Sequence, residues 1–446
     1  MTASSGISWT NPSVKALAKG ADPVETIQEV ARSLVLKARE NGWSGPPFNP
    51  IFIAEMLDVR IEANSSISDA RLFDTKRGPT IEFNPRQPRE RVRFSIAHEI
   101  AHLLFPDWAE QIRNRGGTAG SQDEWQLEML CNIVASELVL PIGSLSDVAE
   151  VPSIEELMQK RREYDVSVEA FLMRMAKISV QPVGVFVASP RISESGYRKY
   201  FVNYYVGSPT SPRVRLQGFE VPKSSVINSC TAIGHTDSSS EDWITGKSTN
   251  VECVGIPGFP GSTFPRVAGF FRFDRAEPNR RLTRYVYGNI LEPKNGGSKI
   301  ICQLVNDKAI KWGGGVARKF GRKYPDAEAQ FSREIMSVPQ DQRLGETIFA
   351  QADVEIQIAS IVAQEGFGPS LFPRIRYSAL EKGLARVADR ALEQNASIHM
   401  PRIGTGAAGG DWDTVQEMID DVMIRAGLTV TIYDPPPKRE QLELFD

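Results

Sequence analysis

The chain has 446 residues, of which 52 are basic and 55 acidic, for a formal net charge of −3. This length exceeds what one hydrophobic core ordinarily holds, so we expect two to four domains. The near balance of charge excludes a global field that would attract nucleic acid or an anionic membrane, and no run approaches the roughly 18 to 20 apolar residues that a membrane span needs.

Cysteine usage and the N-terminal residues indicate the compartment. Cys131, Cys230, Cys253 and Cys302 are scattered without a CxxC pair, which is typical of a reducing environment rather than of a disulfide framework. The first residues, MTASSGISWTNPSVKALAKG, lack the charge-flanked apolar segment of an export signal. We therefore expect a soluble protein of the bacterial cytoplasm.

Three helices are predicted in the N-terminal part of the chain. Asp22-Pro23-Val24-Glu25 is typical of a helix start, because Asp22 can accept the free amides and proline suits the first helical position. After two short strand-like pieces near residues 59–61 and 80–83, the segment RFSIAHEIAHLLF (residues 93–105) has apolar residues at helical spacing. Another helix is expected over residues 124–140, where Pro141 ends it.

The second of these helices carries a candidate metal site. His98 and His102 are four residues apart, so they lie on one helix face and can each offer a ring nitrogen to one zinc ion. Glu99 is placed beside them to take a proton from a zinc-bound water. Because the chain has only four histidines, this HExxH spacing favours a metal site over two histidines in an ordinary apolar helix. The spacing leaves three candidates open for a third ligand: Glu124, Glu128 and Glu137.

The segments RVRFSIAHEIAHLLF and EMLCNIVASELVLP resemble the ImmA/IrrE family of zinc metallopeptidases, over about residues 24–178. The resemblance implies a bound Zn²⁺ and, as protein substrate, a cytoplasmic transcriptional repressor. Two positions depart from the family pattern, since Cys131 and Val134 stand where Ala and Phe are usual, and we interpret both as packing changes. The implied site consists of His98, His102 and Glu128 as ligands and Glu99 as the catalytic base.

The next two segments differ in texture. Residues 153–178 contain two helical stretches joined at EYDVSVEA, a spacing compatible with a helix-turn-helix. Because no base-reading face is evident, we favour a helical hairpin that supports the site, and we expect no strong DNA binding. Residues 183–284 are alternating and aromatic, which predicts a β-rich domain. Its serine-rich segment, residues 235–240, is expected to be a mobile loop.

From residue 285 to residue 436 strands, loops and helices alternate, which predicts an α/β domain with a largely parallel sheet. Two glycine-rich loops precede helical stretches, WGGGVA at residues 312–317 and PRIGTGAAGGDW at residues 401–412. Free amides at a helix start, on a backbone without Cβ atoms, can bind an anion. Two such loops at strand carboxyl ends can hold a diphosphate between them.

The pieces YGNI, ICQLVND, WGGGVA, MPRIGTG and VTIYD resemble a macro domain, an ADP-ribose-binding α/β/α module, over about residues 285–435. The resemblance implies ADP-ribose, or an ADP-ribosylated molecule, as ligand. Asn306 would approach the distal ribose, and Asn289 would meet the adenine where the family has Asp. The implied diphosphate contacts are Gly313, Gly314, Gly315, Val316, Gly404, Thr405 and Gly406.

Catalysis by this domain is a separate question. Macro domains that hydrolyse ADP-ribosyl esters use an Asp in the first glycine loop, or a Lys and Asp pair elsewhere. Ala317, Gln364 and the pair Ala407-Ala408 occupy those positions here. Asp307 is left as a candidate base, and we favour binding without turnover.

The C-terminal residues 437–446 follow three prolines, which favour an extended path. The sequence QLELF resembles the motif that binds the bacterial sliding clamp, which would place its side chains in apolar pockets of that partner. A solvated tail is the alternative. The residues concerned are Gln441, Leu442, Leu444 and Phe445.

The expected fold class is multidomain α+β. Residues 1–182 form a mainly helical peptidase domain, residues 183–284 a β-rich domain, residues 285–436 a macro domain and residues 437–446 a tail. Three functional hypotheses follow. The protein is a zinc endopeptidase regulated by an ADP-ribose-type ligand, an ADP-ribosyl hydrolase with a structural zinc helix, or a non-enzymatic ADP-ribose reader and adaptor.

Overall fold

The computed structural model describes residues 8–110, 123–146, 151–192, 198–259, 262, 264–274, 283–294 and 296–435. They form two compact units, one of residues 1–32 and 44–279, the other of residues 33–43 and 280–446. In the part of the chain that the structure describes, no helix is both long enough and apolar enough to cross a bilayer. The tail residues Gln441, Leu442, Leu444 and Phe445 lie outside the described residues.

The first unit begins with a group of helices around the histidine helix. Asp22 caps α2 as expected, since its Oδ1 accepts from the amides of Val24 at 2.8 Å and Glu25 at 3.1 Å. The predicted histidine helix is α4, and α6 packs along it. The helices are α1 (Pro12–Ala18), α2 (Pro23–Glu40), α3 (Pro50–Met56), α4 (Arg89–His102) and α6 (Glu124–Val139), and the part of α2 from residue 33 onward is grouped with the second unit.

A small sheet lies against α4. Its order is β1-β3-β2, with β1 (Arg60–Ala63) parallel and β2 (Ala70–Thr75) antiparallel to β3 (Gly78–Phe83). The strand-like pieces expected near residues 59–61 and 80–83 correspond to β1 and β3, whereas β2 was not predicted. β2 forms one edge of the sheet and contacts α4, so its backbone reaches the histidine helix.

The two helices after α6 form a hairpin that packs on a second sheet. They are α7 (Ile154–Tyr164) and α8 (Val168–Ile178), and α8 contacts β4, β5 and β8 of that sheet. Glu169 of α8 accepts two hydrogen bonds of 2.9 Å from Arg266 and one of 3.1 Å from the Tyr204 hydroxyl. The hairpin thus supports the sheet through α8.

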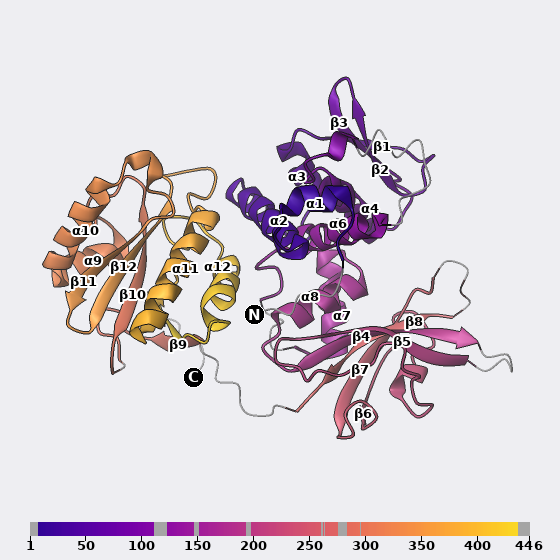
Figure 1. The fold of residues 1–446 in the computed structure, drawn as a ribbon. Coiled ribbons are helices and arrows are strands. Elements are labelled where there is room, and N and C mark those ends of the chain that lie inside the picture. The colour runs from indigo at the N-terminus through magenta and orange to yellow at the C-terminus, as the bar shows by residue number, and fades with distance from the viewer. Residues whose placement is uncertain are drawn as a thin grey trace, which may run out of the picture. The chain divides into compact units, whose positions relative to one another are not determined.

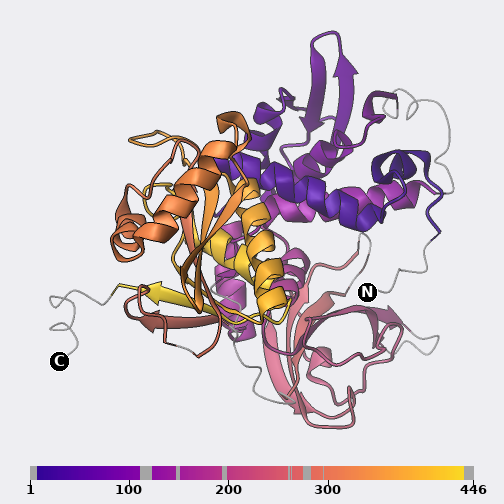
Figure 2. The same cartoon turned by 60° about the vertical axis from the view of Figure 1, so that its left-hand side comes forward.

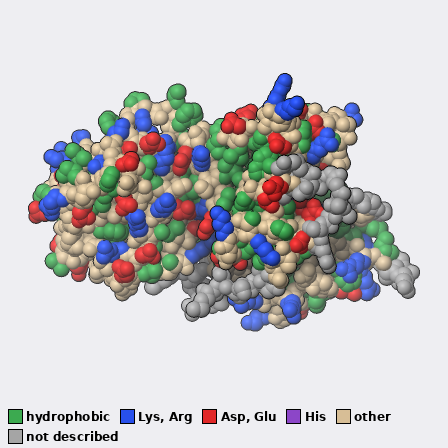
Figure 3. Space-filling model, turned by 45° about the horizontal axis from the view of Figure 1, so that its top comes forward, with side chains coloured by type: hydrophobic (Ala, Val, Ile, Leu, Met, Phe, Trp, Pro, Cys, Tyr) green, Lys and Arg blue, Asp and Glu red, His purple; other side chains and the backbone are tan. Residues whose placement is uncertain are grey.

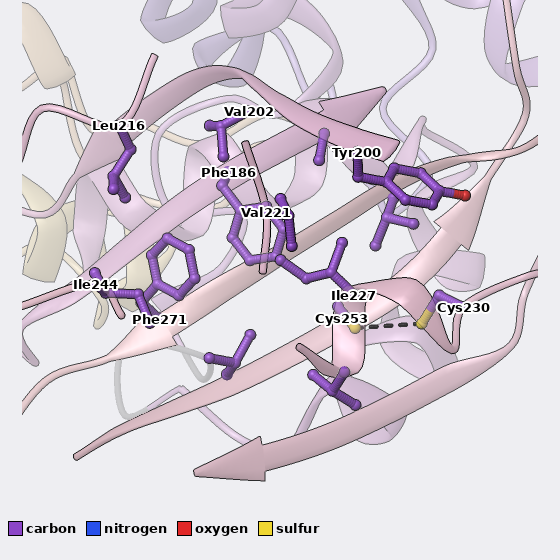
Figure 4. Close-up of a cluster of buried hydrophobic side chains, with 14 of the residues drawn as sticks. Phe186, Tyr200, Val202, Leu216, Val221, Ile227, Cys230, Ile244, Cys253 and Phe271 are labelled. Atoms are coloured by element: carbon purple, nitrogen blue, oxygen red, sulfur yellow. Dashed lines mark hydrogen bonds between the residues drawn. The ribbon is translucent and has the colours of Figure 1, made fainter. Parts of the chain in front are cut away.

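The sheet-rich middle, drawn in magenta to salmon in Figures 1 and 2, is an antiparallel sheet. Its strand order is β5-β4-β8-β7-β6. One hydrophobic cluster fills its face with side chains from the strands and from the segment around the short helix η2 (Val226–Asn228) (Figure 4). In this cluster the Sγ atoms of Cys230 and Cys253 lie 3.2 Å apart, both fully buried. The strands are β4 (Val183–Ile192), β5 (Arg198–Gly207), β6 (Thr236–Glu241), β7 (Thr249–Ile256) and β8 (Arg266–Arg272).

One expectation for this region is wrong. The serine-rich segment predicted as a mobile loop forms β6, which pairs with β7 from Thr236↔Val254 to Glu241↔Thr249. Serine has a low intrinsic preference for strands, but backbone pairing with a buried neighbour overrides local propensity. The segment is therefore an edge strand of the sheet.

The second unit is built on a sheet in the order β11-β12-β10-β13-β14-β9, parallel except for β11. Helices α9 and α10 cover one face and α11 and α12 the other, as Figure 1 shows. The strands are β9 (Thr283–Tyr287), β10 (Lys299–Asn306), β11 (Thr347–Asp353), β12 (Ile356–Gln364), β13 (Ser397–Pro401) and β14 (Val430–Asp434). The helices are α9 (Gly315–Lys323), α10 (Pro325–Ser337), α11 (Tyr377–Gln394), α12 (Trp412–Ile419) and the short η3 (Gln340–Gln342) and η4 (Asp420–Ile424).

The predicted fold class is confirmed: a helical N-terminal region, a sheet-rich middle and a C-terminal macro-type α/β fold. The largely parallel sheet agrees with the strand, loop and helix alternation of the sequence. On the face drawn in Figure 3, basic and acidic side chains are interspersed. This mixing agrees with the near-zero net charge.

Candidate functional site

The histidines of α4 meet one carboxylate of α6. The His98 and His102 rings lie 5.0 Å apart between centroids and are nearly perpendicular, at 72°. Glu128 approaches both, with Oε2 3.0 Å from His98 Nε2 and Oε1 3.7 Å from His102 Nε2. Two imidazole nitrogens and a carboxylate therefore face one another across the α4–α6 contact.

The other two candidate ligands differ in their surroundings. Glu137 is paired with Lys177 and lies 4.0 Å from Arg174, both on α8. Burial by itself raises the pKa of Glu137, but these two charges outweigh it and hold the pKa below its ordinary value. Glu137 thus fastens α6 to α8. Glu124 lies in the first turn of α6, one helical turn before Glu128.

Glu99 points toward β2 and lines an open cavity. Its carboxylate accepts a 2.9 Å hydrogen bond from the Leu72 amide, and the residue is only 8% exposed. The cavity has a volume of about 530 Å³, and His98 and Glu99 share its wall with apolar side chains such as Phe94 and Val139. A carboxylate that accepts from a backbone amide at the edge of a cavity that also contains a histidine is placed to exchange a proton with a molecule bound there.

The two imidazoles also have partners on their other nitrogens. His98 Nδ1 lies 3.1 Å from Asn132 Oδ1, and His102 Nδ1 lies 3.4 Å from Cys131 Sγ. Sequence reasoning missed both contacts and treated Cys131 as a packing residue. The signal was present, because positions 128, 131 and 132 share one face of a helix.

The donor atoms fit a divalent metal ion such as zinc. Nitrogen and carboxylate oxygen donors in a set of three, beside an open cavity, are the donor chemistry of catalytic zinc sites. Burial by itself lowers the pKa of His98, but the hydrogen bond and charge of Glu128 outweigh it, so the pKa lies above the ordinary value.

A second possible set of ligands consists of His98, His102 and Cys131, whose donor atoms lie within 4.8 Å of one another. We prefer Glu128 as third ligand because it faces Nε2 of both rings.

In the second unit the predicted ligand residues lie at or after the carboxyl ends of strands in the parallel part of the sheet. Asn306 ends β10, and the first glycine loop follows β10 itself. The second glycine loop follows β13, which runs parallel to β10. A Cβ atom at Gly313 or Gly314 would meet no other atom within 4 Å. This open space beside the start of α9, the candidate phosphate cradle, gives the phosphates of a nucleotide room to approach the backbone at Gly313 and Gly314.

The second glycine loop is shaped by its own packing. Gly404 has a φ of +81°, and a Cβ there would lie 2.7 Å from Ile375 Cδ1. Thr405 turns its hydroxyl to the Arg402 carbonyl at 2.8 Å, whereas a Cβ at Gly406 would meet nothing within 4 Å. Gly404 is thus required by the backbone, and Gly406 leaves space open.

The polar residues at these strand ends are held by the backbone around them. Asn289 Oδ1 accepts from the Leu291 amide at 3.1 Å, and Asn306 Oδ1 accepts from the Lys308 amide at 3.0 Å. Asp307 Oδ1 accepts from the Gly366 amide at 2.7 Å and so ties two loops together. Such contacts orient the loops around the cradle. The role of Asp307 is therefore structural, because its carboxylate accepts from the Gly366 amide.

The positions where a hydrolase would carry its catalytic groups hold other residues. Ala317 is buried in α9, and Gln364 is buried at the end of β12 with Nε2 donating to the Gly366 carbonyl at 2.8 Å. Neither side chain transfers protons at physiological pH. The geometry of these strand ends therefore favours ligand binding.

Comparison with known proteins agrees with this division. The pattern of the IrrE N-terminal-like domain matches residues 54–176, and that of the Macro domain matches residues 305–419. The radiation response metalloprotease IrrE of Deinococcus deserti is 31% identical over 108 residues, which cover 23% of this chain and 38% of that protein. A macrodomain protein from Streptomyces coelicolor is 35% identical, with 34% of this chain and 98% of that one covered and a TM-score of 0.30.

A further relative is the chromodomain-helicase-DNA-binding protein 1-like of Danio rerio, 27% identical over 169 residues, or 36% of this chain and 16% of that protein. The chain thus spans less than a fifth of the first curated relatives that it matches. The chain therefore joins a metallopeptidase-type domain to a macro-type α/β module. Its N-terminal part is similar to the IrrE N-terminal-like domain family over residues 54–176, and its C-terminal part is similar to the Macro domain family over residues 305–419.

Proposed function

We propose that the protein is a zinc-dependent endopeptidase that cleaves a regulatory protein, such as a transcriptional repressor. The observation that carries the proposal is the meeting of His98, His102 and Glu128, with Glu99 on the wall of the same cavity. The likeness to a radiation response metalloprotease supports it.

The residues of this chain have distinct tasks in such a reaction. His98, His102 and Glu128 would hold the metal, which supplies Lewis acidity to the scissile carbonyl and to a water molecule. Glu99 accepts the proton of the attacking water on its carboxylate and delivers it to the leaving amine. The Leu72 amide, which donates to Glu99, keeps the carboxylate at the cavity wall between these transfers.

The C-terminal unit would bind ADP-ribose or an ADP-ribosylated molecule without hydrolysing it. The open cradle at Gly313 and Gly314 supports binding, and Ala317 and Gln364 at the hydrolase positions argue against turnover. Regulation of the peptidase by this ligand requires that the ligand bind the active and inactive states with different affinity. Proteolysis measured with and without ADP-ribose tests that coupling.

The central experiment is co-expression with proteins encoded nearby, comparing wild type with Glu99→Gln. We expect one partner band to disappear with wild type and to persist with the variant, because general base catalysis contributes roughly 10²- to 10⁴-fold to the rate. Metal analysis of the same preparations should give one zinc per chain in both. A band that disappears equally with Glu99→Gln would contradict the assignment.

The second candidate, an ADP-ribosyl hydrolase with a structural zinc helix, makes the opposite prediction. It expects release of ADP-ribose from a modified protein that survives Glu99→Gln and is lost in Asn306→Ala. The third, a reader and adaptor, expects binding and no product. The sliding clamp as partner of the tail is tested by a pull-down with and without residues 437–446.

A further inference from the structure

Three side chains on one face of α6 contact the two histidines of α4. Glu128 approaches Nε2 of both rings, Cys131 approaches Nδ1 of His102, and Asn132 approaches Nδ1 of His98. Each imidazole is therefore contacted on both nitrogens by the same helix. His102 is 2% exposed and Cys131 is fully buried, so water does not compete at that contact.

The chemistry of a histidine ligand gives these contacts a meaning. A neutral imidazole that binds a metal through Nε2 carries its proton on Nδ1, where it needs an acceptor. An acceptor on Nδ1 fixes the tautomer and the orientation of the ring, and its loss typically weakens metal affinity by about 10- to 100-fold. Asn132 Oδ1 and Cys131 Sγ are acceptors at the required positions.

We infer that Cys131 and Asn132 are positioning residues that hold the Nε2 atoms of His102 and His98 toward Glu128 for metal binding. The inference rests on the proposed metal site and goes beyond it, because it assigns a task to two residues outside the ligand set. It also explains how one helix face, at positions 128, 131 and 132, organises both histidines of another helix.

The alternative is that the Cys131 sulfur is itself a ligand, since its Sγ and a nitrogen of each histidine lie within 4.8 Å of one another. The contact geometry argues against it. Cys131 faces Nδ1 of His102, whereas Glu128 faces Nε2, and one ring binds a given ion through one nitrogen. Ligation by Cys131 would thus turn His102 away from Glu128.

The test is the zinc affinity of the full-length protein, measured by competition with a chromophoric chelator. We expect Cys131→Ala and Asn132→Leu each to weaken zinc binding by about 10- to 100-fold. Cys131→Ser and Asn132→Asp keep an acceptor at the same place and should stay within about threefold of wild type. Val134→Ala is the matched control, because it removes buried volume from the same helix without removing a polar atom.

The melting temperature of each metal-free variant separates positioning from folding, and it should be the same for Cys131→Ala as for Val134→Ala. Equal zinc affinity of wild type, Cys131→Ala and Asn132→Leu would overturn the inference while the metal site stands. A sulfur-to-metal charge-transfer band in the cobalt-substituted wild type, absent from Cys131→Ser, would also overturn it by making the thiol a ligand. A wild type that takes up no zinc would refute the proposed function together with the inference.

Discussion

The buried histidine of the second unit should make this unit less stable as the pH falls below 6.5. His399 lies in β13 and is fully buried. Its Nε2 is 2.9 Å from Ser397 Oγ and its Nδ1 is 3.2 Å from the Tyr433 hydroxyl. Burial, helped by the positive charge of Lys299, lowers the pKa of His399 to about 4 from its ordinary value of 6.5.

The sign follows from proton linkage. Between pH 6.5 and about 4 the unfolded chain binds a proton at His399 that the folded chain does not, so acid favours the unfolded state. Each pH unit in this interval contributes up to about 1.4 kcal/mol. The free energy of unfolding of the second unit should therefore fall by about 2.5 kcal/mol between pH 7 and pH 4.5 because of this one group. The decrease should level off below pH 4.

The comparison of wild type with His399→Gln isolates this contribution. Hydrogen exchange of the β13 and β14 amides, corrected for the intrinsic effect of pH, reports the free energy of opening of this sheet. The difference between the two proteins should change by about 2.5 kcal/mol from pH 7 to pH 4.5. His235→Gln, at an exposed position, should follow wild type. Parallel profiles of wild type and His399→Gln would refute the reasoning.

Four further predictions concern the two sites and the sheet-rich middle. Gly313→Ala should weaken ADP-ribose binding about tenfold or more, equivalent to at least about 1.4 kcal/mol, without loss of stability, because its methyl group fills the open cradle. Equal ADP-ribose binding by wild type and Gly313→Ala would place the ligand elsewhere. Gly404→Ala, at a φ of +81°, should instead lower the free energy of unfolding by about 1 to 3 kcal/mol, as measured by chemical denaturation. Glu128→Ala should abolish stoichiometric zinc by metal analysis, whereas Glu124→Ala should keep it, and the reverse result would reassign the third ligand. Glu252→Gln should destabilise the first unit by about 3 kcal/mol, since this buried carboxylate accepts from Arg272 at 2.7 Å and from the Ile154 amide at 2.8 Å; an unchanged denaturation midpoint would contradict this.

Local pattern was enough for much of the fold. The apolar spacing around His98 and His102 predicted α4, and the strand and helix alternation after residue 285 predicted a largely parallel sheet, because both signals repeat within a few residues. Side-chain periodicity reports which face of a helix a residue occupies, so the two histidines were placed together before any tertiary contact was known.

Contacts between distant segments followed a different rule. The serine-rich segment at residues 236–241 forms a strand because β7 provides its backbone hydrogen-bond partners. Its composition alone disfavours a strand, since serine has a low strand propensity. Cys230 and Cys253 appeared scattered in the sequence, yet their sulfurs lie 3.2 Å apart. In both cases the deciding partner lies elsewhere in the chain, so no local window contains it.

The candidate metal site divides in the same way. The sequence by itself determined that two imidazoles and a neighbouring carboxylate share a helix, since four-residue spacing and helical geometry suffice for that. Only the tertiary structure brought Glu128 rather than Glu137 against both rings and set Cys131 and Asn132 on their far nitrogens. The reason is that the face which α6 turns to α4 is set by its packing against α4 and by the ion pairs of Glu137 with α8, both of which involve distant parts of the chain.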